Sequence, residues 1–209
     1  MEDDCLPHPD FFPFCQAMLE TYPDDERVAM VSGTNYLLQT GVPESYLFSR
    51  YFAIWGWATW RRAWKKYDVN MPAWQSLKEN GYLDYYYPAS YVARHFRRSF
   101  AAASRGDIDT WDLQWAFCCL FNNSLSIVPR VNLISNIGTA GTHTLPGLTD
   151  APLAVFPLGT AELRHPTLVF ANALYDNSLF EKRIRIRPWE RARRKGVVEL
   201  TRLWSRMRG

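Results

Sequence analysis

Hydrophobic residues recur at helical spacing in several stretches of the chain. The clearest set follows Pro9 and comprises Phe11, Phe14, Cys15, Met18, Leu19 and Tyr22. This spacing predicts an amphipathic helix, with Pro13 near the first turn, where proline is tolerated. The same spacing predicts helices over 71–79, which Asn80-Gly81 ends, and over about 89–104. Asp109 and Thr110 are typical start signals for a further helix that runs through Phe121.

Short apolar runs between these helices predict strands. Residues 27–31 read as a short buried strand that ends at Ser32-Gly33, residues 46–54 as a second extended segment, and residues 125–128 as a last short strand. Trp60, Trp64 and Tyr67 fall on one face of a further helix, whose other face is basic. Because helices and strands alternate, the predicted fold class is α/β.

The composition changes twice toward the C-terminus. From Asn132 onward Gly, Thr, Ser and Pro become frequent, which predicts irregular loop. From Lys182 onward the chain is rich in Arg, with hydrophobic residues spaced like one face of a helix. We therefore divide the chain into a main portion at 1–150, a loop-rich extension at 151–181 and a basic amphipathic tail at 182–209.

Aromatic residues make up 15% of the 209-residue chain and include nine Trp. Such rings fill a core or line a concave site, because flat amphipathic rings suit sugars, bases and lipid interfaces. The net charge of +3 is too weak to indicate nucleic-acid binding. The four cysteines include no C-x-x-C pair, and no apolar run reaches the ~18 residues of a membrane helix. We expect a cytoplasmic protein with reduced thiols.

Three consecutive carboxylates, Glu2-Asp3-Asp4, stand at the start of the chain. Neighbouring side chains of an extended backbone point opposite ways, so one or two of these carboxylates can address one ion unless the chain turns. Leu6-Pro7 is the expected turn. Carboxylates at such a position suit a hard divalent cation that takes further oxygens from water and a substrate diphosphate. The alternative is a solvated acidic end in which Asp10 caps the next helix.

A second candidate is Asp112, which lies between Trp111 and Trp115. Asp109 is a natural N-cap, so Asp112 falls in the first helical turn, where the helix dipole favours an ionised carboxylate. A proton acceptor on a rigid element beside apolar rings suits a general base for a sugar hydroxyl. The alternative is a capping arrangement with two core tryptophans.

A third candidate is His143, in the Thr142-His143-Thr144 stretch after a glycine-rich loop. A loop histidine can ligate a metal or bind phosphate. The alternative is an ordinary surface residue.

Seven short segments now form an ordered set: EDD, LPHPDFFPFC, VAMVSGTN, YFAIWGWATWRRAW, DTWDLQW, NLISNIG and THT. In this order they resemble the catalytic half of GT-A nucleotide-diphospho-sugar transferases. The likeness is nearest to a bacterial group distantly similar to N-acetylglucosaminyltransferase I and its protein O-mannose relative, and it covers residues 2–144. An ordered set is more specific than any one of its motifs.

The resemblance implies a role for each candidate. Asp4 would ligate Mn²⁺ or Mg²⁺, Asp3 would lie near the ribose or a metal-bound water, and His143 is a weaker metal candidate. Asp112 would be the general base, although the WDD of eukaryotic relatives is here Trp111-Asp112-Leu113. The substrate pocket would involve Trp55, Gly56, Trp57, Trp111 and Trp115.

The resemblance also implies that the chain is the C-terminal catalytic portion of a GT-A fold, lacking the N-terminal nucleotide-binding strands, with residues 1–150 on the acceptor side. The implied activity is metal-dependent, inverting glycosyl transfer from a nucleotide-diphospho-sugar donor to a glycan or lipid-linked acceptor, in surface polysaccharide or glycoconjugate synthesis. A non-catalytic carbohydrate-binding or assembly fragment of such an enzyme is the alternative.

The tail at 182–209 lies outside the resemblance. Its interleaved Arg and Trp residues are typical of a helix that lies on an anionic membrane, here the inner face of the cell membrane. The alternative is a solvated terminal helix. No recognised nucleic-acid-binding module is present, so we expect no nucleic-acid partner.

Overall fold

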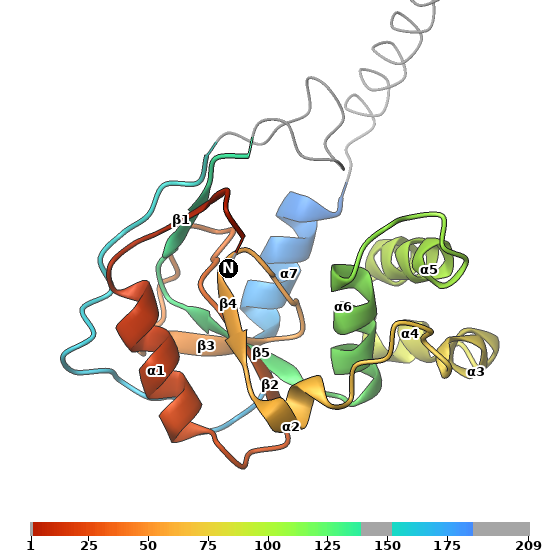
Figure 1. The fold of residues 1–209 in the computed structure, drawn as a ribbon, viewed down its shortest axis with the longest axis horizontal. Coiled ribbons are helices and arrows are strands. Elements are labelled where there is room, and N and C mark those ends of the chain that lie inside the picture. The colour runs from red at the N-terminus through yellow and green to blue at the C-terminus, as the bar shows by residue number, and fades with distance from the viewer. Residues whose placement is uncertain (1, 139–151, 186–209) are drawn as a thin grey trace, which may run out of the picture.

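A four-stranded mixed sheet forms the centre of the molecule (Figure 1). The computed structural model describes residues 2–138 and 152–185. The sheet has the strand order β3-β5-β2-β4 and consists of β2 (Val28–Ser32), β3 (Tyr46–Ser49), β4 (Trp57–Thr59) and β5 (Leu125–Pro129). Strands β2 and β5 are parallel, whereas β3 and β4 run antiparallel to their neighbours. The α/β class predicted from the sequence is confirmed.

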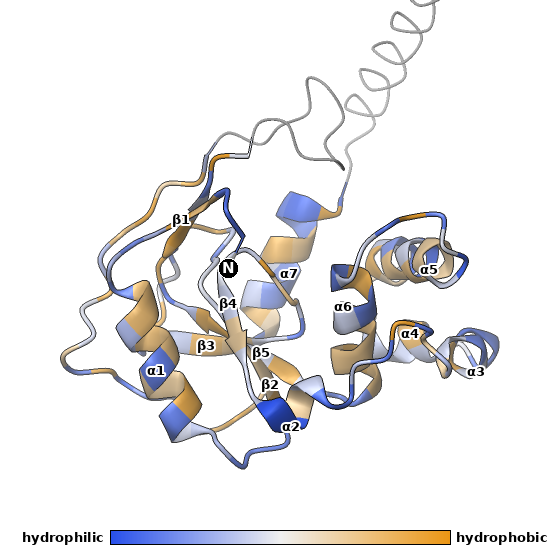
Figure 2. Ribbon diagram, viewed as in Figure 1, coloured by the Kyte–Doolittle hydropathy of each residue, from blue (hydrophilic) through white to orange (hydrophobic). Residues whose placement is uncertain are grey.

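Strands β2 and β5 occupy the middle of the sheet because both of their faces are buried. Figure 2 colours them mostly as hydrophobic, in contrast to the hydrophilic helix α2. The predicted strand over 46–54 ends earlier, at Ser49. The reason is that the N–H of Arg50 donates to the carboxylate of Asp176 (3.2 Å) and leaves the strand ladder.

A second, two-stranded sheet was not expected from the sequence. Strand β6 (Ile134–Asn136) pairs antiparallel with β1 (Cys5–Pro7), so the prediction of irregular loop from Asn132 onward is wrong for these residues. Leu6-Pro7 is part of β1 rather than a turn. The turn lies earlier, where the N–H of Cys5 donates to the carbonyl of Glu2 (3.2 Å). Strands of three residues carry too little periodicity to be read from one sequence.

Seven helices are present in the described residues. They are α1 (Phe11–Thr21), α2 (Arg61–Trp64), α3 (Trp74–Glu79), α4 (Tyr82–Tyr86), α5 (Ser90–Ser104), α6 (Asp112–Phe121) and α7 (Ala173–Arg183). The predicted helices near α1, α3, α5 and α6 are confirmed within a few residues, whereas α2 is shorter than its pattern indicated. Helix α1 covers the sheet at one end, and α3, α4 and α5 form a helical part at the other (Figure 1).

Helix α6 joins the sheet to this helical part. Trp115 is fully buried, and its indole N–H donates to the sulfur of Met30 on β2 (3.4 Å). On another face of the helix, Phe117 packs edge-on against Phe100 of α5, with ring centroids 5.5 Å apart. The first residue of α6 is Asp112 and the N-cap position is Trp111, not Asp109. Asp112 therefore stands on an element that two hydrophobic cores hold in place.

The segment from 152 to 185 returns along the sheet and ends in α7. The carboxylate of Asp10 accepts hydrogen bonds from the backbone N–H groups of Leu158 (2.8 Å) and Gly159 (3.1 Å), and makes no side-chain cap to α1. Although the sequence of 151–181 reads as loop-rich, it contains most of α7, whose first turn is capped by the side chain of Asn172. Helix α7 packs against β3.

Gly56 lies where the chain comes closest to β6. It has a φ of +56°, and a Cβ atom there would meet Cδ1 of Ile134 at 2.3 Å. The carbonyl of Gly56 accepts the N–H of Gly33 (2.7 Å), which holds the backbone in this position. Only glycine satisfies both the left-handed conformation and the close approach.

The Gly56→Ala variant is expected to lower the free energy of unfolding by about 3 kcal/mol, because left-handed strain of about 1 kcal/mol adds to overpacking of about 2 kcal/mol. Gly106→Ala is the matched control, since Gly106 also has a positive φ, +73°, but no atom within 4 Å of its added Cβ. Urea titrations measure both variants. Equal losses would show that the contact with Ile134 is unimportant.

Asp176 is a buried carboxyl at the start of α7, with 4% of its surface exposed. Burial raises its pKa to about 6, although hydrogen bonds from the Ser49 hydroxyl (2.6 Å) and the Arg50 N–H oppose this shift. The folded protein therefore holds this proton more tightly than the unfolded chain. The resulting stability is fully present below about pH 4 and is lost as the pH rises through about 6.

Relative to the Asp176→Asn variant, the wild-type protein is therefore expected to lose about 3 kcal/mol of unfolding free energy between about pH 4 and pH 7. Parallel denaturant titrations of the two proteins across this range give the difference at each pH, so that other titrating groups cancel. A difference that stays constant with pH would mean that Asp176 has an ordinary pKa.

Candidate functional site

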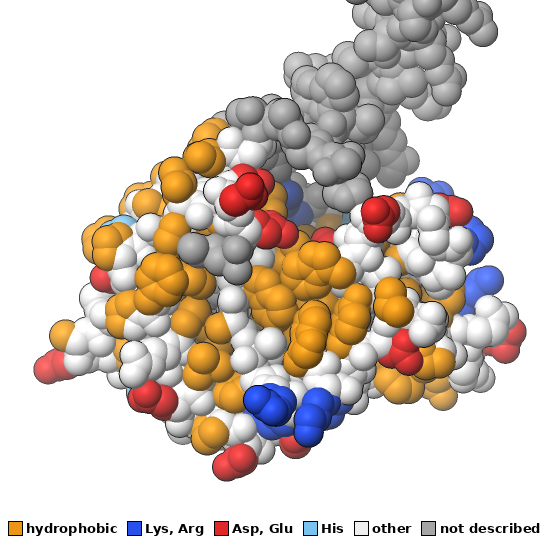
Figure 3. Space-filling model, viewed as in Figure 1, with side chains coloured by type: hydrophobic (Ala, Val, Ile, Leu, Met, Phe, Trp, Pro, Cys, Tyr) orange, Lys and Arg blue, Asp and Glu red, His pale blue; other side chains and the backbone are white. Residues whose placement is uncertain are grey.

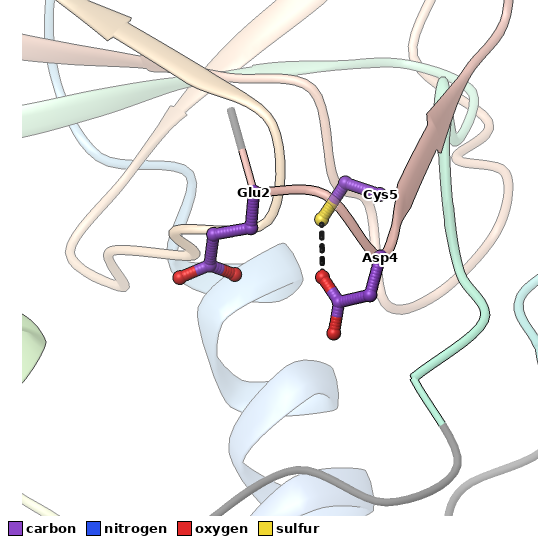
Figure 4. A group of neighbouring side chains, drawn as sticks. All are labelled: Glu2, Asp4 and Cys5. Carbon is purple, nitrogen blue, oxygen red and sulfur yellow. Dashed lines mark hydrogen bonds between the residues drawn. The ribbon is translucent and has the colours of Figure 1, made fainter.

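Two carboxylates and a thiol meet at the start of the chain (Figure 4). One ligand atom from each of Glu2, Asp4 and Cys5 lies within 4.8 Å of the others. The turn before β1 brings the carboxylates of Glu2 and Asp4 to the same side of the backbone. Asp3, between them, is exposed and outside this group. We call Glu2 and Asp4 the acidic corner.

The carboxylate of Asp4 is oriented by two neighbours. The thiol of Cys5 donates to Oδ1 (3.6 Å), and the side-chain amide of Asn136 donates to Oδ2 (3.2 Å). Burial raises the pKa of the Cys5 thiol to about 11, the charge of Asp4 adds to this, and a backbone hydrogen bond from Gly56 partly offsets it. The thiol is therefore protonated at neutral pH and acts as a hydrogen-bond donor to Asp4.

The end of β6 closes around Asp4. The N–H of Ile137 donates to the carbonyl of Asp4 (2.8 Å), and a Cβ atom on Gly138 would lie 2.3 Å from Oδ2 of Asp4. A side chain at this position would therefore have to displace the Asp4 carboxylate. The predicted metal candidate His143 follows shortly afterwards in the sequence but lies outside the described residues.

Asp112 is half-buried at the start of α6, in the first turn as predicted. Its Oδ1 accepts hydrogen bonds from the hydroxyl of Thr110 and from the N–H of Leu113 (2.8 Å). Partial desolvation raises the pKa of the Glu2 carboxyl, and the charges of Asp4 and Asp112 raise it further. The charges of Asp4 and Asp112 therefore both act on Glu2.

Five rings next to Asp112 form what we call the aromatic cluster: Trp57, Trp64, Tyr67, Trp111 and Trp115. Trp57 stacks on Trp111 with centroids 5.5 Å apart, and Trp64 stacks on Tyr67 at 4.7 Å. Trp64 is 42% exposed, whereas Trp115 is fully buried and supports the others from below. Of the indoles predicted to bind substrate, Trp115 therefore has no surface for a ligand, while Trp57 and Trp111 are half-buried.

Figure 3 shows the surface of this region. Hydrophobic side chains gather in the middle of the face, between the part that carries the N-terminal segment and the part formed by α6 and its neighbours. Acidic side chains lie along the upper edge of this hydrophobic surface and basic ones below it, over α2. Trp55, predicted to join the pocket, packs instead against the ring of Tyr36 (5.5 Å).

Two further residues, Tyr51 and Arg183, were not predicted, and Tyr51 interacts electrostatically with Asp112. The guanidinium of Arg183, on the last turn of α7, lies 4.4 Å over the ring of Tyr36 and hydrogen-bonds to Tyr51. Burial raises the pKa of Tyr51, Arg183 lowers it, and the charge of Asp112 raises it. Both the charge of Arg183 and the charge of Asp112 therefore act on the Tyr51 hydroxyl. Arg183 was missed because the sequence analysis did not predict α7, the helix that it ends.

Comparison of the chain with protein-family models, curated proteins and solved structures gives no match. None of the helices within 2–138 and 152–185 has the length and apolar character needed to cross a membrane. A functional interpretation therefore rests on the geometry of the residues described above.

The donor set of the acidic corner fits a hard divalent cation. Glu2 and Asp4 supply carboxylate oxygens, which Mn²⁺ and Mg²⁺ prefer, and their mutual repulsion is relieved by a positive ion. The protonated Cys5 thiol is a poor ligand for such ions.

Binding of Mn²⁺, followed by electron paramagnetic resonance, is expected to weaken by about 10-fold or more in Asp4→Asn, because a charged ligand oxygen is lost. Asp3→Asn is the matched control: it removes the same charge one residue away and should change the affinity by about 2-fold at most. Cys5→Ser should also bind Mn²⁺ nearly normally. Equal losses in the Asp3 and Asp4 variants would rule out a site built by the acidic corner.

Proposed function

We propose that this protein is a metal-dependent inverting glycosyltransferase of GT-A type, which transfers a sugar from a nucleotide-diphospho-sugar to a hydroxyl acceptor. The observation that carries the proposal is the position of Glu2, which interacts electrostatically with both Asp4 and Asp112. This interaction supports a candidate cation site and a candidate general base that act together, with the aromatic cluster next to Asp112. The order of the sequence motifs supports the same activity.

Glu2 and Asp4 would hold Mn²⁺ or Mg²⁺. When bound, such an ion neutralises the charge that develops on a departing nucleoside diphosphate. The protein contributes rigidity, because hydrogen bonds from Cys5 and Asn136 fix the Asp4 carboxylate before any ligand binds. Arg183 places a positive charge beside Tyr51, whose hydroxyl also interacts with the charge of Asp112.

Asp112 would accept the proton of the acceptor hydroxyl as that oxygen attacks the anomeric carbon. Within the described residues its hydrogen bonds both go to Oδ1, from Thr110 and Leu113, so the carboxylate is oriented while Oδ2 stays available to a substrate. The adjacent Trp111 and Trp57 offer apolar ring faces for a sugar. Orientation of this kind lowers the barrier by several kcal/mol.

A second candidate function is carbohydrate binding without transfer. The 42% exposure of Trp64 favours it, because a stacked and exposed indole is a typical sugar platform. A pure binding protein needs neither a cation at the acidic corner nor an ionised Asp112, so the two functions make different demands on these carboxylates.

Turnover is measured as release of nucleoside diphosphate from UDP-N-acetylglucosamine, UDP-glucose or GDP-mannose with Mn²⁺ and a mixture of oligosaccharide acceptors. Asp112→Asn is expected to reduce turnover by about 100-fold or more, because general-base catalysis contributes at least that factor, with Mn²⁺ affinity little changed. Asp109→Asn, a nearby exposed carboxylate, is the control and should keep full turnover. Sugar binding without release from any donor supports the second candidate, and undiminished turnover in Asp112→Asn removes that residue from its role.

A further inference from the structure

Helix α2 presents two exposed cations beside the aromatic cluster. Arg61 and Lys65 are one helical turn apart, so their side chains share a face, and both are exposed. Neither forms an ion pair within the described part of the chain. The other two cations of this segment have protein partners. Arg62 donates to the backbone carbonyls of Pro23, Val28 and Tyr22, and Lys66 forms an ion pair with Glu26.

The exposed ring of Trp64 adjoins these two cations in sequence and connects them to the rest of the aromatic cluster. Its centroid lies 6.0 Å from Trp57 and 6.4 Å from Trp111, the residue that precedes Asp112. The face in Figure 3 thus has acidic side chains at one edge, hydrophobic rings in the middle and basic side chains over α2 at the other edge.

We propose that the aromatic cluster and α2 form a subsite for a saccharide that carries a carboxylate, with a sugar ring on Trp64 and the carboxylate at Arg61 and Lys65. The apolar face of a pyranose stacks on an indole, and a guanidinium binds a carboxylate through two parallel hydrogen bonds. Exposed ion pairs alone contribute little, so ring stacking and charge are both needed. The subsite deepens the proposed function by naming an acidic acceptor glycan.

The charge distribution favours this occupant over a single-stranded nucleic acid, the other common partner of a basic and aromatic surface. A nucleic acid carries a negative charge on every unit, and binding is driven mainly by phosphate contacts. Here two cations stand at one edge and the acidic corner repels anions at the other. A saccharide whose charged sugars alternate with neutral ones carries fewer charges and can leave an uncharged sugar near Asp112.

Isothermal titration without metal or nucleotide compares a hyaluronan tetrasaccharide, which carries glucuronate carboxylates, with neutral chitotetraose. At low salt, the hyaluronan fragment is expected to bind at least about 5-fold more tightly than chitotetraose. This preference should shrink at about 1 M salt, where the charges are screened. Combining Arg61→Gln with Lys65→Gln should abolish the preference. Combining Lys78→Gln with Arg98→Gln, exposed cations on α3 and α5, makes the same charge change elsewhere and should preserve it.

Trp64→Ala should weaken both ligands by about 10-fold, and Trp64→Phe by less, because a smaller ring still stacks. Circular dichroism establishes that each variant is folded. Equal affinity for the two saccharides, an unchanged preference after loss of Arg61 and Lys65, or tighter binding of oligothymidylate would overturn the proposal. This binding assay contains neither a nucleotide-sugar donor nor a cation, so it tests the subsite independently of transfer. A protein that prefers the hyaluronan fragment but transfers no sugar would contradict the proposed enzyme and still support the subsite.

Discussion

The steric fit between Gly56 and Ile134 determines where the acidic corner lies. Since no side chain projects from Gly56, β6 comes against the chain just before β4, and β1 follows because it is paired with β6. An isolated pair of three-residue strands has little stability of its own, so its position depends on this contact. The next residue, Trp57, stacks on Trp111. This close approach of backbone to side chain therefore joins the strand pair next to the carboxylates to the segment that carries Trp57.

Much of the fold could be predicted because its main elements repeat their hydrophobic pattern several times. Helices α1 and α5 bury one face over three or more turns, and β2 and β5 are mostly apolar and fully buried. Strands β1 and β6 could not be predicted, since each is stabilised by a partner from the other end of the main portion. Helix α7 was missed for a related reason: its buried residues include the charged Asp176, whose contacts with Ser49 and Arg50 exist only in the folded chain.

The candidate site shows the same division. Asp4 and Asp112 could be selected from their neighbours in sequence, and the charges of both act on Glu2. The choice of Glu2 over Asp3 depends on a single turn, which the sequence located three residues too late. Trp115 is fully buried, whereas Trp111 is half-buried. This difference cannot be read from the sequence, because it depends on which segments cover α6. Arg183 and Tyr51 come together from segments that share no local pattern.

The way the acidic corner is built decides which kind of cation would fit it. Burial raises the pKa of the Glu2 carboxyl, and the nearby charge of Asp4 raises it further; either a proton or a cation relieves this repulsion. The Cys5 thiol, although it lies in the same group, stays protonated because burial and the nearby Asp4 disfavour the thiolate. A soft metal such as zinc would have to displace that proton, whereas a hard ion needs only the oxygens already oriented by Cys5 and Asn136. The same thiol thus aligns a hard-ion ligand and disfavours a soft ion, which makes Mn²⁺ or Mg²⁺ the better match for this corner.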